Sequence, residues 1–393
     1  MNFTKLVTSN GLFCDGDWIE KKDQDPNGTV RLIQLADIGV CEFKNKSNRF
    51  ITETKAEELN CTYLHKGDIL IARLPDPLGR ACIFPFEGKY ITAVDVAIVR
   101  ISRDDVNPKY VMYMINSPKF RNEIKQYESG TTRKRISRKN LDKIDFEIPP
   151  LAEQNRIVVR IEELFSELDN GVETLRKTKQ QLAVYRQAVL KQAFSADDNA
   201  VKVASICTVV RGGSPRPAGD EKYYNGTIPF LKVADLTNNA DMYLYSHTYT
   251  IKEAGLTKTR LVPANTLLLS NSGATLGVPK ICTFETTFND GIAAFLGLDY
   301  NKEYLPYHYY FWLSKLPEMR AIDQGAAQPN LNTTIIGDVD IPHHDIQTQK
   351  QIAEWIESRL SVCDNIEKTV DITLQQAEAM RQSILKQAFE GRL

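Results

Sequence analysis

Two patterns of apolar and polar residues alternate along the chain, and each occurs twice. The first pattern consists of short apolar runs, rich in β-branched residues and bounded by Gly, Pro or Asp, which is typical of strands. These runs cover residues 68–73, 80–84 and 90–101, and later 266–269, 280–284 and 291–298. Apolar residues at helical spacing follow each group, at 107–128 and 304–313. Each group therefore predicts an α+β globular domain of roughly 150 residues.

The second pattern is a long stretch almost free of Gly and Pro, which predicts a long helix. It runs from about 151 to 194 and again from about 346 to 389. Apolar residues recur every seven positions in both stretches with a shared phase, which indicates a coiled-coil seam rather than two unrelated amphipathic helices. The predicted seam comprises Ile157, Ile161, Leu164, Leu168, Leu175, Leu182 and Val189, and then Ile352, Ile356, Cys363, Ile366, Val370, Ala377 and Ile384.

An internal repeat relates the two halves of the chain. Residues 27–38 read NGTVRLIQLADI, and residues 225–236 read NGTIPFLKVADL at an offset of 198. The sequence LKQAF occurs at 190–194 and again at 385–389, at an offset of 195. Small insertions account for the change of offset, so the chain is a duplicated unit of one domain and one helix.

The repeat defines the expected organisation. It divides the chain into a domain at 1–150, a coiled-coil helix at 151–195, a domain at 196–344 and a coiled-coil helix at 345–393. The shortest connections make the helices antiparallel, and the predicted fold is α+β with an internal pseudo-two-fold duplication. A helix of about 44 residues is up to about 66 Å long, whereas one turn of DNA is about 34 Å. The domains could therefore lie on successive turns of one duplex.

Composition and charge narrow the class of protein. Lys and Arg total 49 and Asp and Glu total 50, so any contact with nucleic acid must be local rather than driven by a global positive field. The seven Cys form no CxxC pair and read as reduced thiols, which excludes a disulfide scaffold. The sequence shows no leader and no apolar run of the ~18 residues that a membrane helix needs. We expect a cytoplasmic protein without a membrane partner.

Motifs for catalysis are weak. The sequence contains no GxxxxGK[ST], no HExxH and no GxSxG, so nucleotide turnover and hydrolysis by these routes are not expected. Asp76, Glu87 and Lys89 resemble the PD…ExK arrangement of metal-dependent nucleases, in which carboxylates hold Mg²⁺. The repeat offers Ala274, Glu285 and Thr287 at these positions. A nuclease is therefore kept only as an alternative.

Basic and amide side chains gather in loops, which suggests contacts with DNA. A dense basic cluster follows Gly130, and Arg is suited to guanine and to phosphate. The equivalent loop in the second half carries amides, which are suited to adenine. Different chemistry in equivalent loops is what two modules that read different sequences should have. The candidate DNA-binding residues are Arg73, Arg80, Arg133, Lys134, Arg135, Arg138, Lys139, Arg211, Asn271, Ser272, Thr275, Gln328 and Asn330.

These features resemble the specificity subunit of type I restriction-modification enzymes over essentially the whole chain. The resemblance is strong at 148–154, where IPPLAEQ opens the first long helix, at 230–236, and at 190–194 and 385–391, where the helices close. It is weak inside the globular domains, which diverge in that family with the sequence that each domain reads. The second helix departs from the pattern by its IPHH lead at 341–344 and by Arg359 in the seam.

The resemblance implies a non-catalytic subunit that binds double-stranded DNA. The two domains would each read one half of a split, asymmetric site, and the coiled coil would fix the spacer and dock two modification subunits. Those partners would bind S-adenosylmethionine and methylate adenine, and restriction subunits using ATP and Mg²⁺ would join for cleavage, so no cofactor is expected in this chain. A coiled-coil scaffold that homodimerises and binds proteins is the remaining alternative.

Overall fold

The chain folds into two compact units, each of which contains one α+β domain and one end of both long helices. In this computed structural model the described residues are 1–131, 133–195, 199–273, 275–321 and 331–393. Unit 1 comprises Met1–Leu175 and Asp371–Leu393, and unit 2 comprises Arg176–Val370. Packing thus divides each long helix between the two units.

The domain of unit 1 is built on an antiparallel sheet of order β1-β7-β4-β5. A second, three-stranded sheet has the order β3-β2-β6, in which β2 and β6 are parallel. The elements of this domain are α1 (Phe3–Leu6), β1 (Leu12–Asp15), η1 (Lys21–Asp23), β2 (Val30–Ile33), η2 (Leu35–Asp37), β3 (Phe50–Ile51), α2 (Glu53–Glu58), β4 (Ile69–Ala72), β5 (Ala81–Ile83), β6 (Tyr90–Thr92), β7 (Val96–Arg100), α3 (Pro108–Asn116), α4 (Pro118–Gln126) and α5 (Arg138–Leu141).

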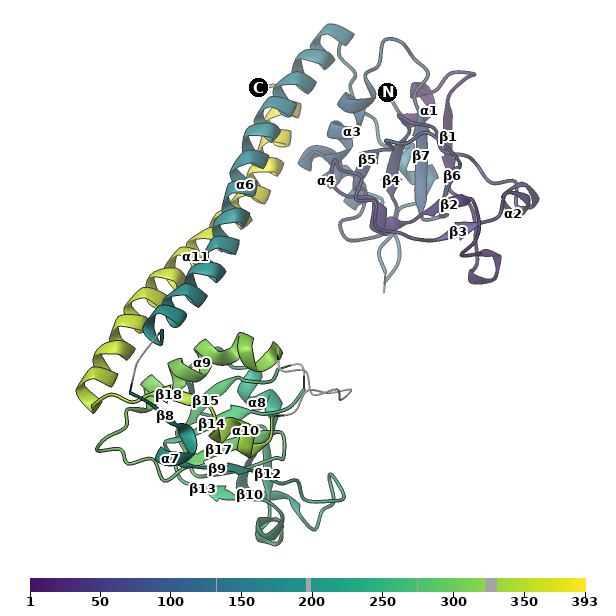
Figure 1. The fold of residues 1–393 in the computed structure, drawn as a ribbon. Coiled ribbons are helices and arrows are strands. Elements are labelled where there is room, and N and C mark those ends of the chain that lie inside the picture. The colour runs from purple at the N-terminus through teal and green to yellow at the C-terminus, as the bar shows by residue number, and fades with distance from the viewer. Residues whose placement is uncertain (132, 196–198, 274, 322–330) are drawn as a thin grey trace. The chain divides into compact units, whose positions relative to one another are not determined.

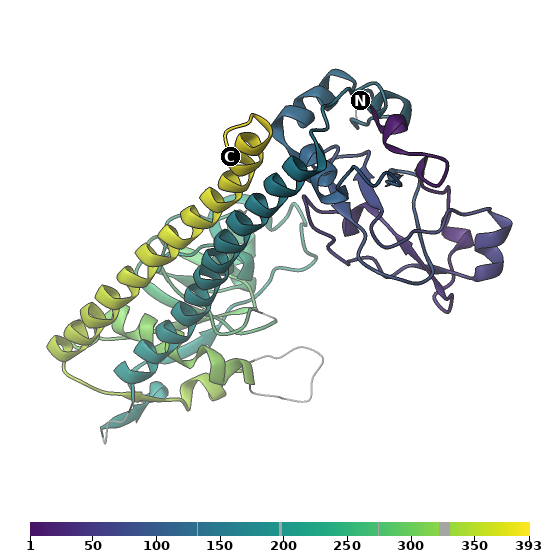
Figure 2. The same cartoon turned by 90° about the horizontal axis from the view of Figure 1, so that it is seen from above.

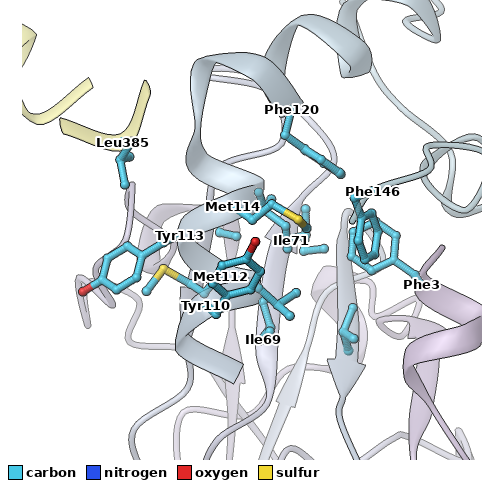
Figure 3. Packing of buried hydrophobic residues seen from close by; sticks show 14 of the residues in the cluster. Phe3, Ile69, Ile71, Tyr110, Met112, Tyr113, Met114, Phe120, Phe146 and Leu385 are labelled. Atoms are coloured by element: carbon cyan, nitrogen blue, oxygen red, sulfur yellow. The ribbon is translucent and has the colours of Figure 1, made fainter. Parts of the chain in front are cut away.

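Aromatic residues and β-sheet residues form the core of unit 1. Phe3 lies 5.2 Å from Phe146 and 6.0 Å from Phe120 between ring centroids, so three distant segments meet at one point (Figure 3). Leu385 from the second long helix belongs to the same buried cluster. The domain and the helix ends of unit 1 therefore share one core.

Unit 2 repeats this architecture. Its main sheet has the order β11-β15-β14-β17-β9, and Figure 1 labels β15, β14, β17 and β9 of this sheet. Its second sheet has the order β12-β10-β16-β13 with β10 and β16 parallel. The elements are β8 (Ala200–Lys202), α7 (Val203–Ile206), β9 (Thr208–Arg211), β10 (Tyr224–Leu231), α8 (Val233–Thr237), β11 (Tyr243–Leu244), β12 (Tyr249–Ile251), η3 (Glu253–Lys258), β13 (Leu261–Val262), β14 (Thr266–Ser270), β15 (Pro279–Cys282), β16 (Thr286–Phe288), β17 (Ile292–Leu296), α9 (Leu305–Ala321), α10 (Thr333–Gly337) and β18 (Asp340–Pro342).

The strand order confirms the predicted duplication and the α+β fold class. Strands β1, β7, β4 and β5 correspond to β9, β17, β14 and β15, with the same neighbours in both sheets. Two local details differ from the sequence pattern. The run at 90–101 forms two strands, and the helical stretch at 107–128 is broken into α3 and α4. The break occurs because the Ser117 hydroxyl accepts the Phe120 N–H and Pro118 has no N–H to continue α3.

The long helices are α6 (Leu151–Ala193) and α11 (Ile346–Phe389), which lie side by side and antiparallel in Figures 1 and 2. In unit 1, Ile161 of α6 shares a buried cluster with Ile384 of α11. In unit 2, Val189 shares a cluster with Ile356. One predicted seam position is wrong: Ile366 is 40% exposed, because the buried residues of α11 keep the seven-residue spacing of Ile356, and Ile366 lies outside it.

Other predicted seam residues differ in how far they are buried. Leu182, Val370 and Ala377 are buried, and so are Ile157 and Cys363, whereas Leu164, Leu168, Leu175 and Ile352 are half-buried.

A buried glutamine joins each long helix to its domain in the same way. The Gln154 side chain, fully buried, donates to the carbonyls of Asp105 and Pro149, and accepts the N–H of Asn107. Gln349 makes the corresponding bonds in unit 2 with the carbonyls of Lys302 and His344. Because an unpaired buried amide costs free energy, these bonds hold the start of each helix in one orientation on its domain.

Candidate nucleic-acid interface

In unit 1 the candidate residues gather at one end of the main sheet, where β1 and β4 end and β7 begins. Arg73 directly follows β4, and its carbonyl accepts the N–H of Ile136 at 3.1 Å. This bond ties the basic loop before α5 to the end of β4. Ser129 and Arg135 close that loop with two backbone hydrogen bonds. Position 130 requires glycine, because its φ is 96° and an added Cβ would lie 2.4 Å from the Arg133 carbonyl.

Asp15, the last residue of β1, lies at the centre of this group. Its carboxylate is 3.3 Å from Nη1 of Arg73 and 3.6 Å from Nε of Arg138. Arg73 also donates through Nη2 to the carbonyl of Val94. Arg138 is stacked over the Phe13 ring, with its guanidinium carbon 5.5 Å from the ring centroid. We call Asp15, Arg73, Arg138 and Val94 the unit 1 edge.

The other cations of the basic loop are exposed. Arg133, Arg135 and Lys139 have no side-chain partner among the described residues, whereas Lys134 pairs with Glu128 at 2.6 Å. Free guanidinium and ammonium groups beside the unit 1 edge are the kind of charge that a phosphate backbone attracts. Their role in DNA binding stays a prediction.

Arg80 corrects one prediction. Its side chain is 7% exposed, and it donates to the carbonyls of Ile38, Leu74, Pro77 and Leu35 over 2.7 to 3.1 Å. Burial lowers its pKa. Because its guanidinium is occupied within the domain, Arg80 holds the loop between β4 and β5 together and does not offer donors to DNA.

In unit 2 the equivalent sheet end carries Asn271, which directly follows β14. Its backbone N–H donates to the Gly291 carbonyl at 2.9 Å, and its carbonyl accepts the Leu331 N–H at 2.8 Å. The side chain is fully buried, and its polar atoms have no hydrogen-bond partner among the described residues, so the predicted direct contact of Asn271 with DNA does not fit this structure. Ser272 is half-exposed and Thr275 is exposed. Gln328 and Asn330 lie outside the described residues.

Arg211 is an exposed cation at this sheet end, and the exposed Arg260 donates through Nε to its carbonyl at 3.0 Å. Arg211 is the last residue of β9, and its Nε donates to the carbonyl of Asp290 at 2.5 Å. The Asp290 carboxylate is occupied by the Ser214 hydroxyl at 2.6 Å. We call Arg211, Asn271 and Asp290 the unit 2 edge.

The nuclease alternative gains no support. Asp76 lies in the loop between β4 and β5, whereas Glu87 and Lys89 lie at the opposite end of β5, before β6. Lys89 pairs with Glu53 instead. Among the described residues, no group of three or more His, Cys, Asp or Glu side chains is arranged to hold a metal ion.

Two further features bear on the class of protein. Within the part of the chain that the structure describes, no helix has the length and apolar character needed to cross a membrane. All seven cysteines are free thiols, as the sequence predicted.

Sequence reasoning missed Asp15, which organises the unit 1 edge, and Asp290, whose carbonyl anchors Arg211. An acidic residue at a strand end has no local signal for such a role. Asp15 reaches the candidate arginines only because β1 pairs with β7, with Asp15 opposite Ala97. An alignment of the two halves by strand register, rather than by sequence identity, matches Asp15 with Arg211 as equivalent positions.

Comparison with known proteins assigns the family. The model of the type I restriction modification DNA specificity domain matches residues 13–182 and 197–376, so the match occurs twice and covers most of the chain. The chain therefore belongs to the type I restriction modification DNA specificity domain family.

Individual relatives agree with this assignment. The chain is 24% identical to the type I restriction enzyme StySPI specificity subunit of Salmonella potsdam, over 73% of this chain and 66% of that protein. It is 21% identical to the putative type I restriction enzyme MjaX specificity subunit of Methanocaldococcus jannaschii, over 88% of this chain and 82% of that protein.

A solved structure shares the fold. This structure concerns complex assembly and conformational transition of the type I R-M system. It superimposes on the present chain with a TM-score of 0.72 at 17% sequence identity. The superposition covers 98% of this chain and 99% of the solved one. At this identity, the likeness concerns the fold alone.

Proposed function

We propose that this chain is the DNA-binding specificity subunit of a type I restriction-modification complex, and that each unit reads one half of a bipartite, asymmetric site. The observation that carries the proposal is the pair of sheet ends. The equivalent ends of the two main sheets each carry an arginine, although on different strands, and the surrounding side chains differ. A common scaffold with different polar chemistry suits two readers of different base sequences.

The proposed subunit has no catalytic role of its own. Two modification subunits would supply S-adenosylmethionine and methylate adenine, and restriction subunits would supply ATP- and Mg²⁺-dependent cleavage. The proposed location is the cytoplasm, where these partners meet the host DNA. The near-balanced total of 49 basic and 50 acidic residues supports a division in which partner subunits provide part of the attraction for DNA.

The paired helices would set the spacer between the half-sites and dock the modification subunits. The buried glutamines at the start of α6 and α11 support this role, because a ruler must be fixed to the domain that it positions. Deleting one heptad from both helices should change the spacer length and leave the half-site sequences unchanged. Altered half-sites with an unchanged spacer would contradict the ruler.

The test of the proposal is selection from a library of fully randomised DNA duplexes by the full-length chain bound to its modification subunits. We expect two short conserved blocks separated by a spacer of fixed length, with retention that falls as the salt concentration rises. Recovery of unrelated sequences at any salt concentration would refute the proposal and would favour a protein-binding scaffold. Nicking of supercoiled plasmid by the chain alone with Mg²⁺ would revive the nuclease alternative.

A further inference from the structure

Both edges hold a guanidinium against a backbone carbonyl. In unit 1, Nη2 of Arg73 donates to the carbonyl of Val94. In unit 2, Nε of Arg211 donates to the carbonyl of Asp290 at 2.5 Å. Each carbonyl belongs to the turn that leads into the second strand of its sheet, β7 beside β1 or β17 beside β9.

The strand register makes these two carbonyls equivalent. Asp15 pairs with Ala97 of β7, and Arg211 pairs with Ala293 of β17. Val94 and Asp290 therefore occupy the same position before Ala97 and Ala293.

The two arginines, in contrast, are not equivalent in the repeat. Arg211 takes the position of Asp15 at the end of the first strand of its sheet, whereas Arg73 takes the position of Asn271 after the next strand. The guanidinium thus reaches the equivalent carbonyl from the β4 side of β7 in unit 1 and from the β9 side of β17 in unit 2.

The charge around the two arginines also differs. Asp15 neutralises Arg73 in the unit 1 edge, where the Arg73 side chain is 14% exposed. In unit 2 no carboxylate lies within ion-pair distance of Arg211 among the described residues, since the Asp290 side chain accepts the Ser214 hydroxyl. Arg211 is exposed, and its one side-chain hydrogen bond among the described residues uses Nε, which leaves both terminal nitrogens available to a ligand.

We propose that Arg211 is a specificity-determining residue of unit 2, that it reads a guanine, and that its functional counterpart in unit 1 is Arg73. The inference rests on the proposed function. The two terminal nitrogens of Arg211 match the O6 and N7 acceptors of guanine in the major groove. In Arg73 each terminal nitrogen carries a second N–H besides the one directed to Val94 or Asp15. The carbonyl bond fixes the plane of the guanidinium before DNA arrives, so less side-chain entropy is lost on binding. In unit 1, Asp15 is a positioning residue, because its carboxylate lies 3.3 Å from Nη1 of Arg73.

The test uses the full-length chain with its modification subunits and the randomised duplex library. Arg211→Asn should abolish the preference for one guanine in one half-site, by roughly 5- to 150-fold, and leave the other half-site unchanged. Arg211→Lys keeps the charge but lacks the fork, so it should retain the salt dependence of binding and lose the same guanine. Full recovery of the preference by Arg211→Lys would overturn base reading.

A double substitution tests the exchange of positions. Arg211→Asp with Asn271→Arg rebuilds the unit 1 arrangement in unit 2, with an aspartate at the position of Asp15 and the arginine approaching the Asp290 carbonyl from β14. We expect it to regain most of the guanine preference that Arg211→Asn loses. A folded double variant that is no more selective than Arg211→Asn would overturn the counterpart relation.

The reciprocal change keeps the idea testable if that double variant does not fold. Asp15→Arg with Arg73→Asn rebuilds the unit 2 arrangement in unit 1, and it should be more selective in its own half-site than Arg73→Asn alone. Equal selectivity of these two variants would again overturn the relation. Wild-type chain that selects no bipartite sequence would instead refute the proposed function, so the two failures are distinguishable.

Discussion

Replacing Arg80 by Met separates a structural role from a DNA contact at one residue. Met retains most of the apolar stem and removes the guanidinium, which bonds four backbone carbonyls. The bonds to Ile38 and Leu74 are buried, and each carbonyl left unpaired there costs about 1–2 kcal/mol. The carbonyls of Pro77 and Leu35 are half-buried and can bond water instead. The expected loss of stability is therefore about 3 kcal/mol.

Thermal unfolding of the full chain measures this loss. For a unit of about 200 residues, 3 kcal/mol corresponds to a fall of about 6–12 °C in the transition of unit 1, while the transition of unit 2 should not move. Arg133→Met is the matched control, because Arg133 is exposed and has no side-chain partner among the described residues. An Arg80→Met variant that melts like the wild type but loses DNA binding would refute the structural role and restore the original prediction.

Three other substitutions test separate features. Arg133→Ala should weaken DNA binding and reduce the slope of log K against log salt by about 0.9, and an unchanged slope would argue against a phosphate contact. Burial raises the pKa of Asp17 to about 6, so the folded state holds a costly charge above that pH. Asp17→Asn, which can still accept the Thr62 N–H, should raise the Tm at about pH 8 and lose this gain towards about pH 4; a gain equal at both pH values would contradict the burial argument. Ile356→Ala should lower the free energy of unfolding by about 2–4 kcal/mol in chemical denaturation, whereas Ile366→Ala on the exposed face should lower it by less than about 0.5 kcal/mol. Equal losses for the two variants would contradict the assignment of Ile356 to the seam and of Ile366 to the exposed face.

Local patterns were enough to predict the elements that depend on local sequence. The seven-residue spacing predicted α6 and α11 closely, because a coiled-coil seam repeats within one helix. The parallel pairs β2–β6 and β10–β16 were not predicted, since each joins segments about 60 residues apart with no local signal. The break between α3 and α4 was visible in Ser117 and Pro118 but was outweighed by the apolar spacing around it.

The candidate site divides in the same way. A run of charge predicted the exposed cations Arg133 and Arg135, and that signal is local. Arg73 and Arg80 carry the same signal, one at each end of one loop, yet only Arg80 is enclosed by carbonyls from distant segments. The roles of Asp15 and Arg211 depend on strand register, which becomes visible only when β1 lies beside β7 and β9 lies beside β17.

The most direct measurement of the central claim is a map of methylated adenines across the host genome, with and without this chain and with its modification subunits present. The account predicts methylation at a two-part motif of fixed spacing only when the chain is present. Replacing Arg211 by Asn should then relax one part of that motif and leave the other intact. An unchanged methylation pattern without the chain, or a single uninterrupted motif with it, would contradict the account.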